Sequence, residues 1–472
     1  MPSIVEIVSV APQQMAYLGI DLGTGGIRCL LLDESGEILT DLSRPLLKIN
    51  LSTVPGQSEQ DADDWIAILD DVLCELFSTP LHRQIKAIAV DSTSGTVLPV
   101  SSAGNALGYA LLHNDVRAEK QAESCASVFA GSCSPTFSLP KILWMQENLQ
   151  LPPDALFLHA TDFLNAWLVG HMDLPTDSTN AMKSGLDLET GQWSGQMPAV
   201  NLPRVVPPGQ VIGELATVHC ARWGLSKGIK LVSGATDSNA AFYASGAGLP
   251  GEWSTTIGTT LAIKGISQKK VEDPQGCIYC HRHPDGHWLP GGASNAGGEI
   301  LREHKQALAS LAAIANRTVV PNSLVYPSVR KGERLPFSDP SFEPFFEGTE
   351  KGGADYLLAC LEGIAFVECL SYELLEQLGA EVGNRIYVTG GAASSELGLQ
   401  IRADILQKSL SVPAHPHSAM GAAILAAAGY QQKQVGEVSK EMVSISAVVE
   451  PLPSSNGRRE EKMEKFRREC QL

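Results

Sequence analysis

Two carboxylates and two glycine–threonine turns carry the residue types that chemistry on a phosphate group requires. Asp21 ends one apolar stretch and is followed by the turn Gly23-Thr24. Asp237 ends another apolar stretch, and a second turn, Gly258-Thr259-Thr260, follows it. A carboxylate can accept the proton of an attacking hydroxyl or hold Mg²⁺, and glycine lets backbone amides approach a phosphate closely. The pattern favours phosphoryl transfer, with one carboxylate and one turn from each half of the chain.

Each of these residues also has a purely structural interpretation. Asp21 could cap a turn, because an aspartate accepts hydrogen bonds from its own backbone two residues on. Asp237 precedes Ser-Asn-Ala-Ala and could be only the N-cap of a helix. The pair Gly390-Gly391 could be a plain strand-to-helix turn. These interpretations stay open on the residues alone.

The stretch YLGIDLGTGGIRCLLLD, residues 17–33, first suggests a dinucleotide-binding loop, because three glycines follow a hydrophobic strand. Such a loop must open a helix whose N-terminus faces the pyrophosphate. The residues that follow instead run through a Ser-Gly turn into another strand, which is a hairpin pattern. The stretch WSTTIGTTLAIKGIS, residues 253–267, repeats the order of strand, Gly-Thr turn and strand. We therefore expect two like-folded domains, whose two hairpin loops could clamp a phosphate chain.

Strands and helices alternate along the chain, which predicts an α/β fold. Residues 59–79 are predicted to form a helix with Asp61 as its N-cap and an apolar stripe on one face. Residues 354–380 are predicted to form a long helix that Gly379 ends. Open α/β sheets bind ligands beyond the carboxyl ends of their strands. The candidate site residues lie at such ends: Asp21, Ser94, Asp237 and Gly390.

Charge and composition exclude several classes of protein. The 472 residues carry a formal net charge of −17, whereas nucleic acids and anionic membranes attract clustered lysine and arginine. The N-terminus lacks the basic start of a secretory signal, and no apolar run reaches the roughly 18 residues of a membrane-spanning helix. Ten scattered cysteines fit a reducing cytoplasm better than a disulfide framework. We therefore expect a globular cytoplasmic protein.

A cluster of cysteines and histidines, GCIYCHRHPDGHW, allows a different kind of site. Thiolates and imidazoles are the preferred ligands of zinc. In a strand, however, Cys277 and Cys280 would point to opposite faces, and no second Cys-x-x-Cys pair occurs. We interpret the segment as a strand.

Nine segments, taken in order, resemble the FGGY carbohydrate kinase family of the sugar kinase/actin/chaperone ATPase superfamily. GIDLGTGGIR resembles the first phosphate loop, PGQSEQDADDW the Gly-x-x-Glu-Gln-Asp-x-x-x-Trp segment, and SLPKILWMQEN the Pro-Lys-Leu-x-Trp helix. SGATDSNAAFYASGAGLPGEWSTTIGTT resembles the base with the second phosphate loop. The other segments of the set are TDSTNAMKSGLDLETGQWS, LPRVVPPGQVIGEL, KGERLPFSDP, LEGIAFVEC and VTGGAASSELGLQIRADIL. The match runs from Tyr17 to about Gln471. The resemblance implies an α/β fold of two actin-like (ribonuclease H-like) domains with an interdomain cleft.

The resemblance also implies ATP-dependent phosphorylation of a small sugar or polyol with Mg²⁺. Asp237 would be the general base, and Asp21 would help to hold the metal, with Asp237 as the second carboxylate facing it. The nucleotide and its metal would meet Asp21, Gly23, Thr24, Gly258, Thr259, Thr260, Gly390, Gly391 and Ala392. The sugar would meet Ser94, Gly95, Asp115 and Asp237.

By the same resemblance the chain divides into an N-terminal extension, residues 1–16, and two domains. Residues 17–234 would carry the sugar site and the first phosphate loop. Residues 235–472 would carry the base, the second phosphate loop, the adenosine site and a C-terminal helix. The partners expected are a small sugar and ATP, with no nucleic acid and no membrane, and the protein would be a monomer or a homodimer.

Departures from the family's pattern bear on the substrate. Xylulose kinases usually have Gly-Gln-Met-His-Gly where this chain has DSTSGTV, and glycerol kinases place an Arg-Glu pair there. The small Ser-Gly pair resembles the Thr-Ser-Gly-Thr of the ribulose-kinase-like branch, so D-ribulose is favoured over xylulose. His113 and Asn114 stand where a tryptophan is frequent ahead of Asp115, and His417 replaces a frequent acidic residue. The contacts to sugar and adenosine at these positions therefore depart from the family's.

Two other functions share parts of this pattern. An actin-like regulator or chaperone ATPase would have both turns but no sugar-facing segment, so EQDADDW and LLHNDVR favour the kinase. A non-catalytic sugar-binding member would be expected to lack some of the reactive residues, whereas all are present: Asp21, Thr24, Asp237 and Gly258.

Overall fold

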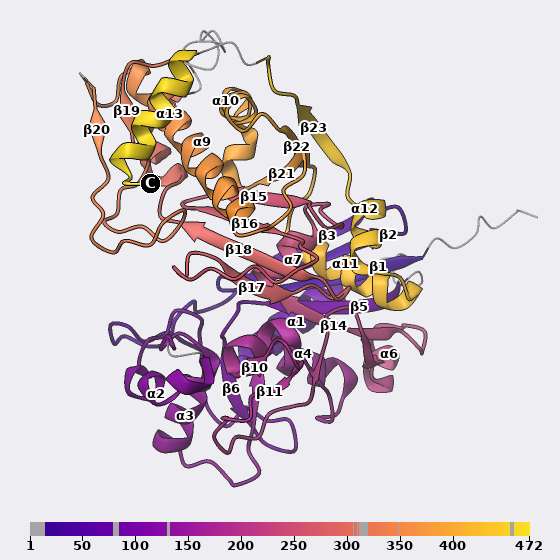
Figure 1. The fold of residues 1–472 in the computed structure, drawn as a ribbon. Coiled ribbons are helices and arrows are strands. Elements are labelled where there is room, and N and C mark those ends of the chain that lie inside the picture. Colours follow the sequence, from indigo (N-terminus) through magenta and orange to yellow (C-terminus); the bar gives the residue numbers. More distant parts are fainter. Residues whose placement is uncertain are drawn as a thin grey trace, which may run out of the picture. The chain divides into compact units, whose positions relative to one another are not determined.

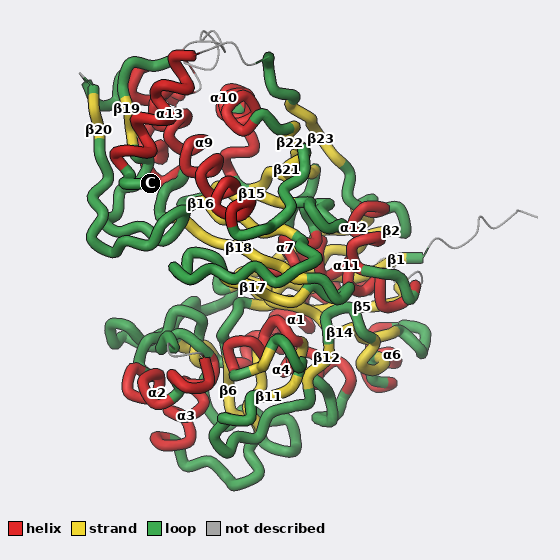
Figure 2. Tube along the Cα trace, in the orientation of Figure 1, coloured by secondary structure: helices red, strands yellow, loops and turns green. Residues whose placement is uncertain are grey.

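The computed structural model describes residues 15–78, 85–129, 133–304, 306–308, 310, 320–348, 350–453 and 457–472. The chain divides into two compact units. The first contains the residues up to Ala241 together with His417–Met442, and the second contains Phe242–Pro416 together with Val443–Leu472. Figure 1 labels their helices and strands, and Figure 2 shows that both units mix the two kinds of element.

The first unit is built around a six-stranded mixed sheet. Its strands are β1 (Ala16–Gly23), β2 (Gly26–Asp33), β3 (Ile38–Pro45), β5 (Ile85–Ser92), β13 (Val211–Glu214) and β14 (Lys230–Thr236), in the order β13-β14-β5-β1-β2-β3. β5 pairs in parallel with β1 on one side and with β14 on the other, and the other neighbours are antiparallel. The β1–β2 hairpin that the sequence predicts is confirmed.

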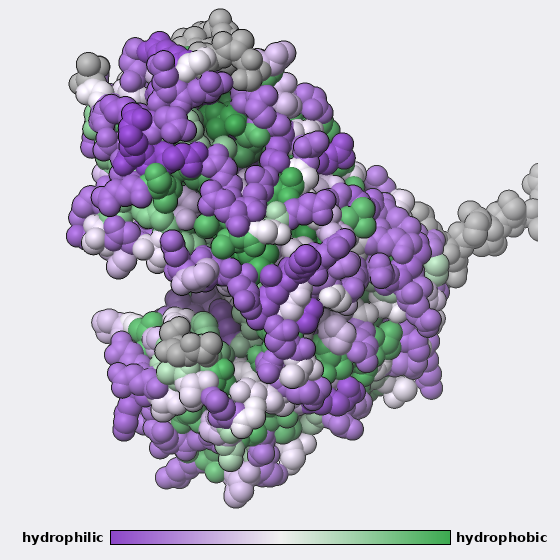
Figure 3. Space-filling model, viewed as in Figure 1, coloured by the Kyte–Doolittle hydropathy of each residue, from purple (hydrophilic) through white to green (hydrophobic). Residues whose placement is uncertain are grey.

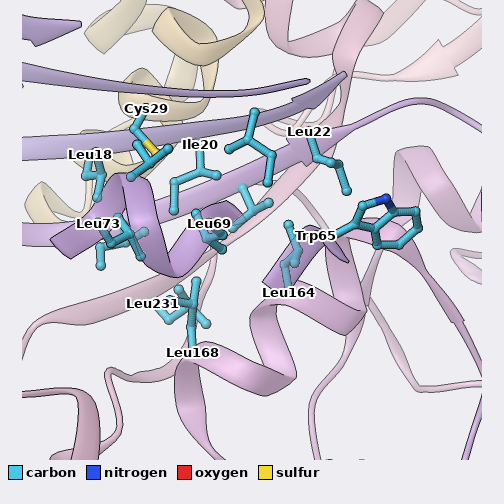
Figure 4. Close-up of a cluster of buried hydrophobic side chains, with 14 of the residues drawn as sticks. Leu18, Ile20, Leu22, Cys29, Trp65, Leu69, Leu73, Leu164, Leu168 and Leu231 are labelled. Carbon is cyan, nitrogen blue, oxygen red and sulfur yellow. The ribbon is translucent and has the colours of Figure 1, made fainter. Parts of the chain in front are cut away.

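Helices cover both faces of this sheet. α1 (Ala62–Phe77) and α4 (Ala160–Val169) pack against the face that carries Leu18 and Ile20, and Figure 4 shows this apolar cluster. α11 (Ser418–Gln431) packs against β1, β5 and β14 on the face that carries Gly19. A Cβ on Gly19 would lie 1.9 Å from the carbonyl oxygen of Ala419, so only glycine allows this close approach.

α1 follows the pattern that its sequence predicts. Asp61 is the N-cap, since its side chain accepts a hydrogen bond from the backbone N–H of Asp63. The apolar stripe is buried, with Trp65 packed edge-on against Phe163 of α4. The helix thereby ties the segment before it to the main sheet.

A smaller sheet and several short elements complete the first unit. This four-stranded sheet has the order β4-β7-β6-β8, with β4 at Glu59–Gln60, β6 at Val97–Val100, β7 at Ala110–Leu111 and β8 at Leu156–His159. The other elements are α2 (Glu119–Ser124), η2 (Ala126–Phe129), α3 (Ser138–Asn148), β9 (Thr176–Asp177), α5 (Ser178–Ala181), η3 (Met182–Ser184), β10 (Leu186–Asp187), β11 (Gln192–Trp193), β12 (Val205–Val206), α6 (Thr217–Trp223) and α12 (Val435–Met442).

The second unit repeats the pairing scheme of the first. Its main strands are β15 (Trp253–Ile257), β16 (Leu261–Gly265), β17 (Tyr279–Arg282), β18 (Trp288–Ser294), β21 (Arg385–Thr389), β22 (Ser409–Pro413) and β23 (Ile445–Val449), in the order β17-β18-β16-β15-β21-β22-β23. β21 is parallel to β15 and β22, and the other pairs are antiparallel. β15–β16 therefore corresponds to β1–β2, and the prediction of two like-folded domains is confirmed.

The remaining elements of the second unit lie around this sheet. They are η4 (Gly298–His304), β19 (Leu324–Val325), β20 (Phe346–Glu347), α9 (Ala354–Gln377), η5 (Gly391–Ser394), α10 (Glu396–Leu406) and α13 (Gly457–Glu469). α9 ends just before Gly379, which has a φ of +86°, as the sequence predicts. The segment with Cys280 and His281 is the strand β17, in agreement with the strand interpretation. α7 (Asp237–Tyr243) carries the chain from the first unit into the second.

The division into units differs from the boundary expected from the sequence. That boundary placed all of residues 235–472 in the second domain, whereas α11 and α12 belong to the first unit. The cause is the close packing of α11, because a Cβ on its Gly421 would lie 1.8 Å from the carbonyl oxygen of Ala240.

Most of the surface in Figure 3 is hydrophilic. No helix in the described ranges has the length and apolar character needed to cross a membrane.

Candidate active site

Three neighbouring strands of the first unit bring three carboxylates to the same end of the sheet. Asp21 lies near the end of β1, and Asp91 of β5 is its direct partner across the two parallel strands. β14 pairs with β5 up to Thr236 and Ser92, and Asp237 follows as the first residue of α7. Because these strands are parallel, their carboxyl ends meet at one edge, where α/β sheets bind ligands.

Asp91 is the most buried of the three carboxylates. Its side chain is fully buried and accepts no hydrogen bond from an N–H or a hydroxyl of the described residues. Burial raises the pKa of Asp91 well above its usual range, and the nearby charges of Asp21 and Asp237 add to this effect. When Asp91 is protonated it can donate a hydrogen bond to Asp21. Nothing in the local sequence indicates that Asp91 pairs with Asp21.

Asp237 is held at the start of α7 but is not fully buried. Its Oδ1 accepts a hydrogen bond of 2.7 Å from the backbone N–H of Ser238. This bond to the next residue differs from an N-cap contact, which would come from an N–H two or three residues on. The half-buried position of the carboxylate leaves it accessible to a small molecule.

The first glycine–threonine turn is supported from the segment around residue 60. Gln60 is buried, and its Nε2 donates to the carbonyl oxygen of Thr24 at 2.8 Å and to that of Ile49 at 2.9 Å. The indole N–H of Trp65 donates to Gln60 Oε1 at 2.9 Å. The Gln and the Trp of the Gly-x-x-Glu-Gln-Asp-x-x-x-Trp segment therefore hold the turn in position, with α1 as the rigid support.

A buried lysine fixes the turn that contains Ser94 and Gly95. Lys141 of α3 is fully buried, and its Nζ donates to three carbonyl oxygens: Gly95 at 3.0 Å, Leu112 at 2.5 Å and Thr136 at 2.9 Å. Burial lowers the pKa of Lys141 to about 7. The three N–H groups of an ammonium match three acceptors, so one side chain joins three loops. This explains the lysine of the Pro-Lys-Leu-x-Trp helix, which the sequence reading used only as a marker.

Asp115 is engaged by the protein's own backbone and by an arginine. Its carboxylate is fully buried, accepts from the N–H of Ser58 at 2.7 Å, and forms an ion pair with Arg117 at 2.7 Å. A sugar contact from Asp115 stays a prediction.

His113, two residues earlier, has a buried Nδ1 with no hydrogen-bond partner in the described part of the chain. Burial lowers the pKa of His113, and the charges of Lys141 and Lys183 lower it further.

The second glycine–threonine turn lies in the second unit, between β15 and β16. The N–H of Gly298 donates to the carbonyl oxygen of Gly258 at 2.9 Å, so the turn rests on the backbone after β18. A Cβ on Gly298 would lie 2.6 Å from that oxygen, and one on Gly297 would lie 2.6 Å from the carbonyl oxygen of Thr259. Glycine is therefore required at both positions. A Gly-Gly pair shortly after a strand is the only local signal of this role in the sequence.

A cavity of about 700 Å³ in the second unit joins several of the predicted nucleotide residues. Gly258, Gly391 and Ala392 line it together with apolar side chains of α9 and η4. Gly390 lies beside them, because a Cβ there would be 2.5 Å from the carbonyl oxygen of Ile257. An apolar cavity with a few polar groups at its edge suits a purine nucleoside. Thr259 lies next to it, where its Oγ1 accepts a 3.4 Å hydrogen bond from Arg302.

The first-unit carboxylates fit a magnesium ion that arrives with a phosphate ligand. Asp21 Oδ1 is buried and accepts no N–H or hydroxyl hydrogen bond from any described residue. Across the ranges that the structure covers, no three His, Cys, Asp or Glu side chains form a group able to hold a metal. Mg²⁺ is commonly bound by one or two carboxylates together with water and phosphate oxygens. This donor set fits such an ion.

The arrangement can perform chemistry on a hydroxyl and a phosphate. The structure brings Asp21 and Asp237 to one edge of the first sheet, and Gly258, Gly391 and Ala392 to one cavity of the second unit. Gly23 and Thr24 form the β1–β2 turn, and Thr260 follows Gly258 in the β15–β16 turn. The residues that the sequence analysis missed are the ones that hold these groups from other segments: Gln60, Asp91, Lys141, Gly297 and Gly298.

Comparisons with known proteins agree with this geometry. Residues 16–243 match the N-terminal domain, and residues 254–430 the C-terminal domain, of the FGGY family of carbohydrate kinases. A xylulose kinase of Staphylococcus epidermidis is 27% identical over 468 residues, which cover 92% of each chain. A gluconokinase of Bacillus subtilis is 26% identical and covers 86% of each chain.

Solved structures share the fold. A xylulose kinase from Rhodospirillum rubrum superposes with a TM-score of 0.82 at 22% identity, over 96% of this chain and 97% of that one. A gluconate kinase from Lactobacillus acidophilus has the same TM-score at 21% identity, over 97% of both chains. At identities of 21% and 22%, these comparisons show that the fold is shared.

Proposed function

The chain belongs to the FGGY family of carbohydrate kinases, and from this premise we propose that it transfers the γ-phosphoryl group of ATP to a hydroxyl of a ketopentose. D-Ribulose is the favoured substrate and xylulose the next. The observation that carries the proposal is the position of Asp237 beside Asp21 and Asp91 at the carboxyl edge of three parallel strands.

Asp237 is the proposed general base. Its carboxylate accepts the proton of the sugar hydroxyl while the hydroxyl oxygen forms a bond to the γ-phosphorus of ATP. The bond between that phosphorus and the bridging oxygen breaks, and ADP leaves. Mg²⁺, when bound, neutralises charge on the phosphates, and Asp21 is the residue proposed to hold it.

The other predicted residues are assigned to binding. The amides and hydroxyls of the two glycine–threonine turns are suited to phosphate oxygens, because they donate hydrogen bonds without bulk. The adenosine is assigned to the cavity lined by Gly258, Gly391 and Ala392. The sugar is assigned to the turn of Ser94 and Gly95, whose small side chains leave room for a polyhydroxylated chain.

Ribulose is preferred over xylulose on the basis of this turn. The turn Ser94-Gly95 differs from the Gly-Gln-Met-His-Gly of xylulose kinases. We also propose that the protein acts in the cytoplasm, since all ten cysteines are free thiols.

The test is an ADP-release assay with D-ribulose, xylulose, gluconate and glycerol, in the wild type and in Asp237→Asn. The wild type is expected to release ADP fastest with D-ribulose. Asp237→Asn should lower kcat by at least about 100-fold, the usual contribution of a general base, at an unchanged unfolding temperature.

The matched control is Asp154→Asn, which changes an exposed aspartate and should keep full activity. Full turnover in Asp237→Asn would contradict the role of Asp237 as base. ADP release that is equally fast with and without every sugar would instead favour an actin-like ATPase.

A further inference from the structure

Lys183 is a charged residue at the sugar turn that the proposed reaction does not yet use. It lies in η3, and its side chain is half-buried. Its Nζ is 3.4 Å from the carbonyl oxygen of Ser94 and lies over the ring of Phe137, 5.8 Å from the centroid. The ammonium group is therefore held against the same turn to which the sugar is assigned.

Gly95 lies close to this lysine. It has a φ of +88°, and a Cβ there would lie 3.0 Å from the carbonyl oxygen of Thr136 and 3.3 Å from Cδ of Lys183. A larger residue would crowd both groups and would be strained in this backbone conformation. The glycine therefore allows the turn to pack against the stem of Lys183.

The ammonium group of Lys183 has donors to spare. An ammonium has three N–H groups, and the only acceptor found for Lys183 among the described residues is the 3.4 Å carbonyl oxygen of Ser94. The nearby charges are Asp237, which attracts it, and Lys141, which repels it. A half-buried ammonium with unused donors is costly unless a ligand completes its hydrogen bonds.

We propose that Lys183 is a further substrate-contacting residue, whose ammonium group donates hydrogen bonds to an oxygen of the bound sugar. The inference rests on the proposed function and deepens it, because it assigns the ammonium group of Lys183 to a carbonyl or hydroxyl oxygen of the sugar at this turn.

The experiment compares Lys183→Met, Lys183→Arg and the wild type. Methionine keeps the apolar stem against Phe137 and removes the charge. Binding of D-ribulose without nucleotide is measured by titration calorimetry, and steady-state ADP release gives KM for D-ribulose and for ATP separately. The expected result for Lys183→Met is a 10- to 100-fold weaker Kd and a 10- to 100-fold higher KM for D-ribulose, the range for loss of one charged hydrogen bond. The KM for ATP should stay within about twofold, and Lys183→Arg should recover part of the loss.

Lys433→Met is the control, because Lys433 is a surface lysine paired with Glu441 and should leave every constant unchanged. Ribulose binding by Lys183→Met within about twofold of the wild type would overturn the inference. The inference would also be overturned if Lys183→Met lost affinity for ATP to the same extent, or if it lost affinity for gluconate while its affinity for D-ribulose stayed unchanged. If the wild type binds D-ribulose but does not phosphorylate it, the proposed kinase reaction is refuted. The contact from Lys183 would still be supported if Lys183→Met binds D-ribulose more weakly than the wild type.

Discussion

Gly390 and Gly391 are neighbours with different structural demands. Gly390 has a φ of +83°, and a Cβ there would lie 2.5 Å from the carbonyl oxygen of Ile257. At Gly391 a Cβ would meet no atom within 4 Å. Only the first glycine therefore holds the end of β21 against β15, next to the cavity assigned to adenosine.

We predict that Gly390→Ala lowers the free energy of unfolding by about 2 kcal/mol or more, because of the backbone overlap and the strained φ. Gly391→Ala should change it by less than about 0.5 kcal/mol. Urea denaturation of both variants measures the difference. Equal stability of the two variants would show that the close approach to Ile257 is not maintained in solution.

The sequence could predict the positions of some candidate site residues and not of others. The positions of Asp21 and Asp237 were predictable, because each comes at the end of an apolar strand, and their chemical roles stay predictions. Asp91 and Lys141 were not predictable, because their importance depends on pairing with Asp21 and on three loop carbonyls far along the chain. The local sequence shows which chemical group a residue carries, but it does not show which distant residues contact that group in the folded protein.

The turn between β17 and β18 contains a buried histidine. His283 has a fully buried side chain, and its Nε2 has no hydrogen-bond partner among the residues described. It packs edge-on against the ring of Tyr243 at 5.6 Å between centroids, and Asp285 and His287 are its charged or titratable neighbours. Burial lowers the pKa of His283 to about 4. The hairpin is therefore built around a neutral imidazole.

This pKa predicts a loss of stability in acid. In the unfolded chain histidine titrates near 6.5, so between pH 6.5 and 4 the unfolded state binds more protons than the folded state. The stability that His283 contributes is complete above about pH 6.5 and falls as the pH drops toward 4, by about 2 kcal/mol at pH 5. His283→Gln should show a smaller drop in unfolding temperature between pH 7.5 and pH 5 than the wild type. His171→Gln, which changes an exposed histidine, should follow the wild type, and identical pH profiles for all three proteins would contradict the prediction.

Individual elements were largely predictable from the sequence. α1 has the N-cap and the buried stripe that its spacing indicates, and α9 ends before Gly379. The two hairpins with glycine–threonine turns are present as β1–β2 and β15–β16. These features are set by neighbours in the sequence, namely capping side chains, apolar periodicity and turn glycines.

At the scale of the whole molecule, the grouping of elements was not predictable. α11 lies near the C-terminal end of the chain but packs on the first sheet, against Gly19 and Ala240. The residues of α11 are mostly alanine and glycine, and nearly all of them are buried. Such small residues allow close packing, but they do not indicate which element the helix packs against. The order of strands in the sheets was not predictable for the same reason, since the parallel pairings β1–β5, β5–β14 and β15–β21 join strands distant in sequence.

We predict that Gly421→Ala destabilises the protein by about 3 kcal/mol, because the added methyl group would meet the backbone of Ala240. A Cβ on Gly457 would meet nothing within 4 Å, so Gly457→Ala serves as the control. The unfolding temperature of each purified variant measures the effect. If Gly421→Ala unfolds at the wild-type temperature, α11 does not pack against Ala240 as closely as the structure has it.

The return of α11 to the first sheet has a consequence for synthesis on the ribosome. The chain completes Phe242–Pro416 before it makes the helix that covers β1, β5 and β14. Nascent domains otherwise tend to fold in order from the N-terminus. In this protein one apolar face of the first sheet stays uncovered until residues 417–442 have left the exit tunnel, so the first unit cannot complete its folding before then. The second unit also contains Val443–Leu472, so it too is completed only after α11 and α12 have been made. A chaperone acting on the nascent chain would therefore have its target on the Gly19 face of the first sheet.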